Sequence, residues 1–317
     1  MPPAAQALLT RKLPCAALML VMFTAPAWAS LLAPIPVLGL LAVSAALAAH
    51  LLVPMVAAIV AMGGGLGFAL PTVGLMGAGV WAASGFAWPV GISAFLLYGL
   101  APAIAGWLLL SRVRGLERAA AALLAFTAGV VFVSWAWYAH AQGIAPAELG
   151  EKLLREIVQG REASEIQKLV HALAQGMPGW IAAGIWVAWL GNLVLARSVM
   201  QRWGLFAGDT RPIYMLSFRP RLGLGFLGLA TAALLGEGSV RFWAESGAIA
   251  LAAPIAAQGT FAVHAWLAAR EMTLAIATLY LMLALWSAMI LPLLIVGLAD
   301  LWLDFRKQGG RNAGDSA

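Results

Sequence analysis

Three polar side chains near the end of an apolar run are the best candidates for chemistry. Thr260, His264 and Glu271 are spaced so that a helix running unbroken through residue 271 would carry them within about 40° of one face. Gln258 stands at the start of the same stretch. A buried imidazole within reach of a carboxylate can bind a proton or a polar ligand. We therefore predict a ligand site here, unless Glu271 only marks the membrane boundary and His264 bonds a backbone carbonyl.

Asn192 is a further candidate for this ligand site. It lies inside the apolar run 178–196, where a side-chain amide needs a hydrogen-bond partner because lipid supplies none. Two interpretations stay open: a bond to a neighbouring helix that fixes packing, or a contact with a ligand inside the helical bundle.

Charged residues at the ends of two apolar runs could form a docking surface for a partner or for lipid headgroups. Arg219 and Arg221 precede one run, and Asp300, Asp304 and Arg306 follow the last one. Two carboxylates at a helix C-terminus oppose the helix dipole, and the basic residues that follow can offset them. Interfacial salt bridges are the plainer interpretation of the same pattern.

The residues needed for a metal, a cofactor or a nucleophile are scarce. The four histidines never stand four residues apart, and Cys15 is the only cysteine, so neither a histidine pair nor a thiolate cluster can form on one helix. No glycine-rich phosphate loop ends in Gly-Lys. We predict no metal, no cofactor and no enzyme, with an intramembrane enzyme using His264 and Glu271 as a weaker alternative.

The composition explains what must position these residues. Hydrophobic residues make up 63% of the 317 residues and charged residues 10%, against about 45–50% and about 25% in soluble domains. So few charges cannot cover a water-exposed surface, which excludes a soluble, disordered or nucleic-acid-binding protein. The net charge of +6 sits mostly between apolar runs, where membrane topology explains it.

We expect one all-α integral membrane domain over residues 1–317, a transmembrane bundle of about eight spans (range 7–10). Residues 13–111 contain no charged residue and have room for four or five spans, with prolines at the joints. The first of these spans also resembles a cleavable signal segment. The other expected spans are 119–141, 178–196 and two to three within 222–303, where 246–269 and 272–299 are long enough and 222–236 is short.

Two polar segments predict the orientation. Residues 146–175 have helical spacing of apolar residues and balanced charge, which is typical of an amphipathic helix or helical pair with a break near Gly160. Residues 197–221 carry five arginines against Asp209, so we place this loop in the cytoplasm and 146–175 outside. If the basic tail 304–317 is also inside, an even number of spans follows residue 221, and we expect 222–236 not to cross.

Four motifs in this order resemble the YybS-like family of bacterial membrane proteins, known as domain of unknown function family 2232. The motifs are Asn192-Leu193-x-Leu195-Ala196-Arg197, Phe218-Arg219-Pro220, Gln258-Gly259-x-x-x-Val263-His264 and Gly297-Leu298-x-Asp300-x-Trp302-x-Asp304-Phe305-Arg306. The resemblance covers roughly residues 30–308. It implies a bacterial inner-membrane protein grouped with the substrate-binding components of energy-coupling-factor transporters, which dock on a transmembrane coupling subunit with two ATPases.

From these observations we expect a solute-binding or transport-related subunit in the lipid bilayer, without an ATPase of its own. A membrane scaffold or assembly factor that recruits proteins through 146–175 and the basic loop is the alternative.

Overall fold

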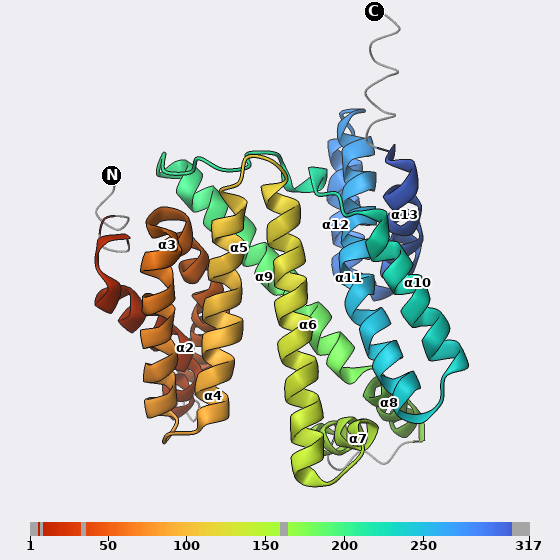
Figure 1. Ribbon diagram of the computed structural model, residues 1–317, viewed down its shortest axis with the longest axis horizontal. Coiled ribbons are helices and arrows are strands. Elements are labelled where there is room, and N and C mark those ends of the chain that lie inside the picture. Colours follow the sequence, from red (N-terminus) through yellow and green to blue (C-terminus); the bar gives the residue numbers. More distant parts are fainter. Residues whose placement is uncertain (1–5, 7–8, 33–35, 159–163, 306–317) are drawn as a thin grey trace, which may run out of the picture. The chain divides into compact units, whose positions relative to one another are not determined.

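The computed structural model describes residues 6, 9–32, 36–158 and 164–305, and every regular element in these ranges is a helix (Figure 1). Six helices in these ranges are long and apolar enough to cross a membrane: 12–29, 39–83, 88–109, 115–142, 177–202 and 238–268. Three shorter apolar helices follow in the C-terminal part. The chain is therefore a multi-pass membrane protein by helix length and hydropathy. The break expected near Gly160 lies outside the described residues.

The chain forms two compact units. The first contains residues 1–130 and 185–210, and the second contains 131–184 and 211–317. Helices α6 (Gly115–Gln142) and α9 (Met177–Arg202) contribute residues to both units. Asn192 belongs to the first unit, whereas the other predicted ligand-site residues belong to the second.

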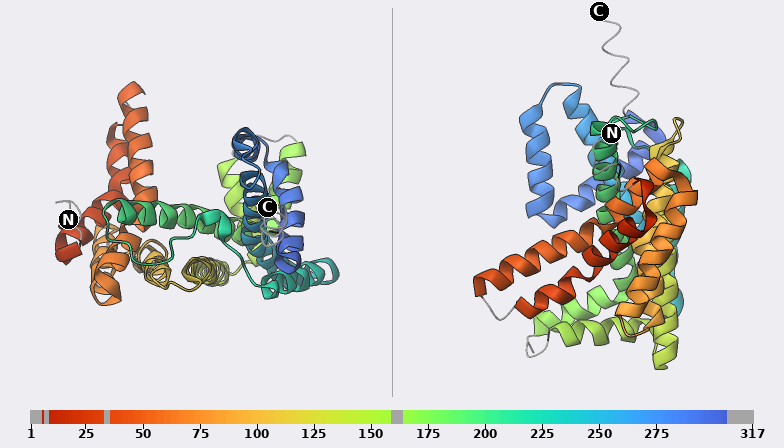
Figure 2. Two further views of the ribbon diagram at one scale, coloured as in Figure 1. Left: turned by 90° about the horizontal axis from the view of Figure 1, so that it is seen from above. Right: turned by 90° about the vertical axis from the view of Figure 1, so that its left-hand side faces the viewer.

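The first unit begins with α2 (Lys12–Ala29), the short helix η1 (Ser30–Leu32) and the long helix α3 (Pro36–Ala83). Helix α2 lies alongside α3 in both views of Figure 2. We expected breaks at the prolines, but α3 continues through Pro54 and Pro71 and bends at Gly65 instead. Gly65 has φ 70° and ψ 176°, a conformation that glycine adopts at little cost. Buried residues from both arms of α3 join one apolar core with α2.

The span 88–109 of the first unit changes its hydrogen-bonding pattern along its length. Helix α4 (Trp88–Ser93) passes into a π-helix, η2 (Ala94–Leu100), and then into α5 (Ala101–Leu109). The π-helix is rare, and where it appears as a single turn within an α-helix it is frequently found at functional sites. This one packs against α3.

Both basic segments of the first unit lie at the same end. The Asp209 N–H donates to the Leu109 carbonyl at 3.0 Å, and the Asp209 carboxylate accepts the Leu116 N–H at 3.1 Å. Asp209 therefore caps the first turn of α6, where orphan N–H groups need acceptors. These bonds hold the loop after α9 against the turn that contains Arg112.

In the second unit, the segment 146–175 forms two amphipathic helices, α7 (Pro146–Ile157) and α8 (Ser164–Gln175), that pack against each other. Pro146 suits the first helical position, and the Glu148 carboxylate accepts the Ala145 N–H at 3.3 Å. The Trp135 Nε1–H donates to the Pro146 carbonyl at 2.9 Å, and Leu149 packs beside Phe242. These contacts fix α7 to the end of α6 and the start of α11.

The remaining helices of the second unit are α10 (Pro220–Leu235), α11 (Gly238–Ala268), α12 (Thr273–Leu285) and α13 (Ile290–Leu303), with short 3₁₀ helices η3 (Ile213–Met215) and η4 (Ser287–Met289). Helices α10 and α11 form an antiparallel hairpin, visible in Figure 1. The run 272–299, which we expected as one span, is instead two short helices. The backbone turns extended at Trp286 (φ −134°, ψ 95°) and separates α12 from α13.

The ends of α11 show which segments share a side of this unit. The turn between α10 and α11, at 236–238, lies beside α7 and α8. Phe218 and Asp300 instead both bind Gln258, which lies on α11. At about 1.5 Å per residue, Gln258 is about 24 Å further along α11 than Phe242, which lies at the α7–α8 end. The loop before α10 and the end of α13 therefore share one end of this unit, and α10 runs from that end to the α7–α8 end. At 16 residues α10 is shorter than the six candidate spans, so our expectation that 222–236 does not cross stays a prediction. The tail from residue 306 onward lies outside the described residues.

Candidate functional site

A buried hydrogen-bond network surrounds Gln258, which is fully buried. Its Oε1 accepts the Phe218 N–H at 2.8 Å, and its Nε2 donates to Oδ2 of Asp300 at 2.9 Å. The other oxygen of Asp300 accepts the Phe305 N–H at 2.9 Å. We call these four residues the Gln258 network. It joins α11 to the loop before α10 and to the end of α13.

This network changes the interpretation of two predicted sites. We predicted Gln258 for ligand binding, but both polar atoms of its amide bind the protein itself. We predicted Asp300 for a docking patch, but it is only 3% exposed. Buried polar groups need such partners, because an unmade hydrogen bond costs about 1–3 kcal/mol. The network therefore holds three segments together rather than presenting a surface.

The remaining predicted ligand residues of α11 separate. The Thr260 hydroxyl donates to the Ala256 carbonyl of its own helix at 2.9 Å. His264 Nδ1 lies 2.9 Å from the Tyr280 hydroxyl, and its ring stacks on Tyr214 with centroids 4.6 Å apart. Helix α11 ends at Ala268, and Glu271 sits in the following turn with φ 58°. The shared face that we predicted for His264 and Glu271 therefore does not form.

Asn192 forms a hydrogen bond within its own helix in the first unit. Its Nδ2 donates to the Ala188 carbonyl at 2.9 Å, one turn earlier in the same helix. Its Oδ1 is buried and has no hydrogen-bond partner among the described residues. The bond to another helix that we considered is not formed among the described residues, and the ligand contact stays a prediction.

The other predicted docking residues lie near the Gln258 network. Arg219 and Arg221 are exposed at the start of α10, and Asp304 ends α13 with a left-handed φ of 46°. Arg306 lies outside the described residues. Arg219 and Arg221 are thus exposed beside a buried network, Asp304 is half-buried, and the docking role stays a prediction.

A cleft that the sequence analysis did not predict lies at the other end of the second unit. It has a volume of about 580 Å³ and is lined by the start of α7 (145–147), by α8 (171–175) and by the first two turns of α11 (238–245). We call it the α7–α11 cleft. Phe242, 2% exposed, contributes an apolar wall, and Gln175 and Ser239 add polar groups.

Two opposite charges line the α7–α11 cleft. Arg241 is exposed and Glu245 is half-buried, one helical turn further along α11. Within the described part of the chain, neither side chain makes a hydrogen bond or an ion pair. A charged group at a partly enclosed wall is stabilised best by a partner, so both side chains are available to a ligand.

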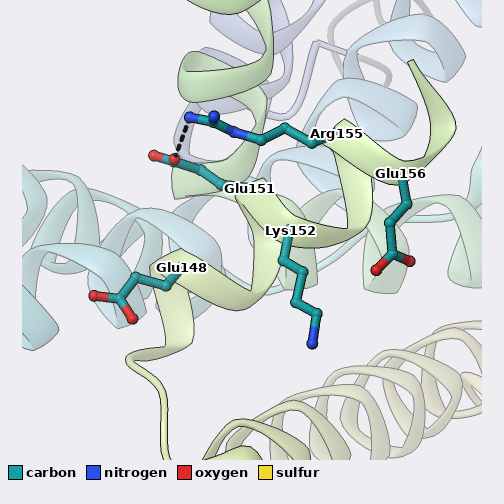
Figure 3. Close-up of a pocket in the computed structure, with 5 residues that line it drawn as sticks. All are labelled: Glu148, Glu151, Lys152, Arg155 and Glu156. Carbon is teal, nitrogen blue, oxygen red and sulfur yellow. Dashed lines mark hydrogen bonds and ion pairs between the residues drawn. The ribbon is translucent and has the colours of Figure 1, made fainter. Parts of the chain in front are cut away.

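The α7–α8 pair is also joined by a charged contact. His171 Nδ1 lies 2.7 Å from Oε1 of Glu151, and Arg155 lies 3.2 Å from the other carboxylate oxygen. The hydrogen bond with His171 is the main cause that lowers the pKa of Glu151 below its ordinary 4.5. Figure 3 shows Arg155 reaching back to Glu151, whereas Lys152 and Glu156 point away from that pair. All five side chains drawn come from α7, so they form a charged outer face rather than an enclosed site.

The first unit also contains a polar cluster around the half-buried His50. Nδ1 of His50 lies 2.8 Å from the Phe23 carbonyl oxygen, which requires an Nδ1–H donor. In the neutral ring, Nε2 then accepts the Tyr98 hydroxyl proton at 2.8 Å. Trp189 contacts the Tyr98 ring and donates its Nε1–H to Leu97 of the π-helix at 2.6 Å. These contacts join α2, α3, η2 and α9.

Sequence reasoning missed the α7–α11 cleft and the His50 cluster for the same reason. Both combine segments that are far apart in the chain, and no spacing rule brings such segments together. The only available signal for the cleft was the pair Arg241 and Glu245, two charges inside a mostly apolar stretch.

Comparisons with known proteins give no assignment for this geometry. No family model, no curated protein and no solved structure matches the chain.

Proposed function

We propose that the chain is a solute-binding subunit of a transport system in the bacterial inner membrane, without an ATPase of its own. The observation that carries the proposal is the α7–α11 cleft. Its volume of about 580 Å³ falls within the range of small-molecule sites, about 300–1,000 Å³. It combines an apolar wall with a few polar and charged groups, the usual composition of such sites.

The orientation is consistent with a receptor for solutes outside the cytoplasm. The positive-inside rule places the basic loop 197–221 in the cytoplasm, and the cleft lies at the opposite end of the second unit from Phe218. The proposed kinship with energy-coupling-factor components adds the partners: a transmembrane coupling subunit and ATPases. The surface that we assign to them contains the exposed Arg219 and Arg221 and the half-buried Asp304.

Native mass spectrometry of the detergent-purified protein tests the proposal, with two tryptophan substitutions on α8. Ala172 lines the cleft, so Ala172→Trp should fill it without changing any charge. Leu169 is 57% exposed on the same helix and does not line the cleft, so Leu169→Trp is the matched control. We expect a small molecule retained by the native protein and by Leu169→Trp, and lost from Ala172→Trp.

The second candidate function is a membrane scaffold, which the charged outer face of α7 favours. In that case the same spectra would show a stoichiometric protein partner and no small molecule on any variant. Substituting Lys152 and Glu156 on that face would then release the partner. Such a result would overturn the solute-binding proposal.

A further inference from the structure

The α7–α11 cleft places two unpaired opposite charges one helical turn apart. Arg241 and Glu245 line the same cleft, yet neither is paired within the described residues. Residues four apart on a helix are neighbours, with Cβ atoms about 5–6 Å apart, but a basic residue N-terminal to an acidic one is the less favourable order for pairing. The cleft therefore offers a guanidinium and a carboxylate side by side, each open to a partner from outside the chain.

Resting on the proposed function, we infer that the solute is a zwitterion with an apolar body, of the class of apolar amino acids and dipeptides. Its carboxylate binds the Arg241 guanidinium near the mouth, where Ser239 adds a hydroxyl donor. Its ammonium binds the Glu245 carboxylate one helical turn further along α11, in a cleft that the Gln175 side chain also lines. Its apolar part packs on Phe242 and Ala172.

Charge balance selects this class over singly charged solutes. A solute that fills the cleft removes water from both side chains, and a charge that loses water without gaining a partner is costly. An anion would leave Glu245 uncompensated, and a cation would leave Arg241 uncompensated. A zwitterion satisfies both, and the guanidinium can hold a carboxylate through two parallel hydrogen bonds.

The size of the cleft agrees with this class. A volume of about 580 Å³ accommodates a single amino acid or a dipeptide with a branched apolar side chain. Arg241, Phe242 and Glu245 all line the cleft, so one ligand can contact all three.

Calorimetric titration of the purified protein in nanodiscs tests the inference with matched probes. L-leucine and L-leucyl-L-leucine carry both charges, leucinamide lacks the carboxylate and 4-methylpentanoate lacks the ammonium. We expect at least one of the zwitterions to bind, and the two singly charged analogues to bind about tenfold more weakly or worse, because each loses one charge-assisted contact.

Two neutral substitutions assign each charge to its partner. Arg241→Gln should weaken leucine binding and remove the preference over leucinamide, because the carboxylate then has no cation to bind. Glu245→Gln should instead remove the preference over 4-methylpentanoate. Lys152→Gln and Glu156→Gln change the same charges on α7 outside the cleft and should bind as the native protein does.

The outcomes separate this inference from the proposed function. If neither zwitterion binds, or if both substituted proteins keep native discrimination, the zwitterion class is refuted. The proposed function still stands in that case if Ala172→Trp removes a co-purified small molecule. If Ala172→Trp and Leu169→Trp behave alike and no small molecule is bound, the proposed function fails as well.

Discussion

At the residue scale, Gln258 shows how a polar side chain in an apolar helix can be misassigned. Its position predicts that it needs a partner, because a buried amide is costly without one. The sequence cannot say whether that partner is a ligand or the protein. In the structure the partner is the protein itself. The Phe218 N–H donates to the amide oxygen of Gln258, and the amide nitrogen donates to the Asp300 carboxylate. Asp300, 42 residues later, was predicted for a different role because nothing local connects the two.

The contact between Glu151 and His171 predicts a pH dependence of the α7–α8 pair. The lowered pKa of Glu151 means that its ionised form is favoured in the folded state. Its stabilising contribution is therefore fully present above the ordinary carboxyl value of 4.5 and is lost as the pH falls through the lowered folded value. We expect faster amide hydrogen exchange in α7 and α8 at acidic pH, after correction for intrinsic rates.

Two substitutions on α7 make this measurement specific. Glu151→Gln should remove the acid-dependent step in the exchange of α7 and α8. Exchange near neutral pH should become faster, by an amount that corresponds to no more than roughly 1 kcal/mol of stability, as is typical of exposed pairs. Glu156→Gln alters an exposed carboxylate without a partner among the described residues, so its exchange should follow the native profile. An unchanged acid step in Glu151→Gln would assign the step to another group.

At the element scale, glycine spacing alone does not show where two helices cross closely. Gly63 and Gly67 have the spacing of a close helix contact, but a Cβ added at Gly67 would meet nothing within 4 Å. The chain bends at Gly65 instead. One close crossing of two helices occurs at Gly259 and Gly297, which lie on α11 and α13 and share no spacing pattern. A close crossing needs one small residue on each helix, and only the folded chain shows which ones meet.

The crossing of α11 and α13 predicts a strong effect of one added methyl group. In Gly259→Ala, the new Cβ would collide with the Leu293 carbonyl oxygen, a backbone atom that cannot move alone. We expect a loss of about 1–3 kcal/mol or more, as for other overpacked interiors, seen as lower thermal stability in detergent. Gly228→Ala on α10 meets open space and should be neutral. Equal stability of the two variants would contradict this crossing.

Long helices were easier to predict than their interruptions. The expected spans 119–141 and 178–196 correspond to α6 and α9 because apolar runs of that length have few other solutions in lipid. The expected span 272–299 did not form, because the backbone leaves the helix at Trp286. No proline or glycine marks that position, and the prolines that seemed to mark joints at 54 and 71 lie within α3.

At the scale of the whole molecule, charge asymmetry predicts an orientation but not the path of the chain. The second unit places 146–175 and the Phe218 loop at opposite ends of α11, the arrangement expected from the basic residues. An even number of spans after residue 221 can be reached whether or not the short run 222–236 crosses the membrane. From the sequence we predicted that it stays on one side. Sixteen residues of α10 extend about 24 Å, which is short for a bilayer but enough to reach the α7–α8 end.

Cysteine labelling decides this path. In a Cys15→Ser background, single cysteines replace four exposed residues: Thr210, Arg219, Lys152 and Glu237. A membrane-impermeant maleimide should label Lys152→Cys and Glu237→Cys on intact cells, because the α10–α11 turn lies beside α7 and α8. Thr210→Cys and Arg219→Cys should react only after permeabilisation, because both belong to the arginine-rich loop. Labelling of Glu237→Cys from the same side as Arg219→Cys would show that α10 does not cross.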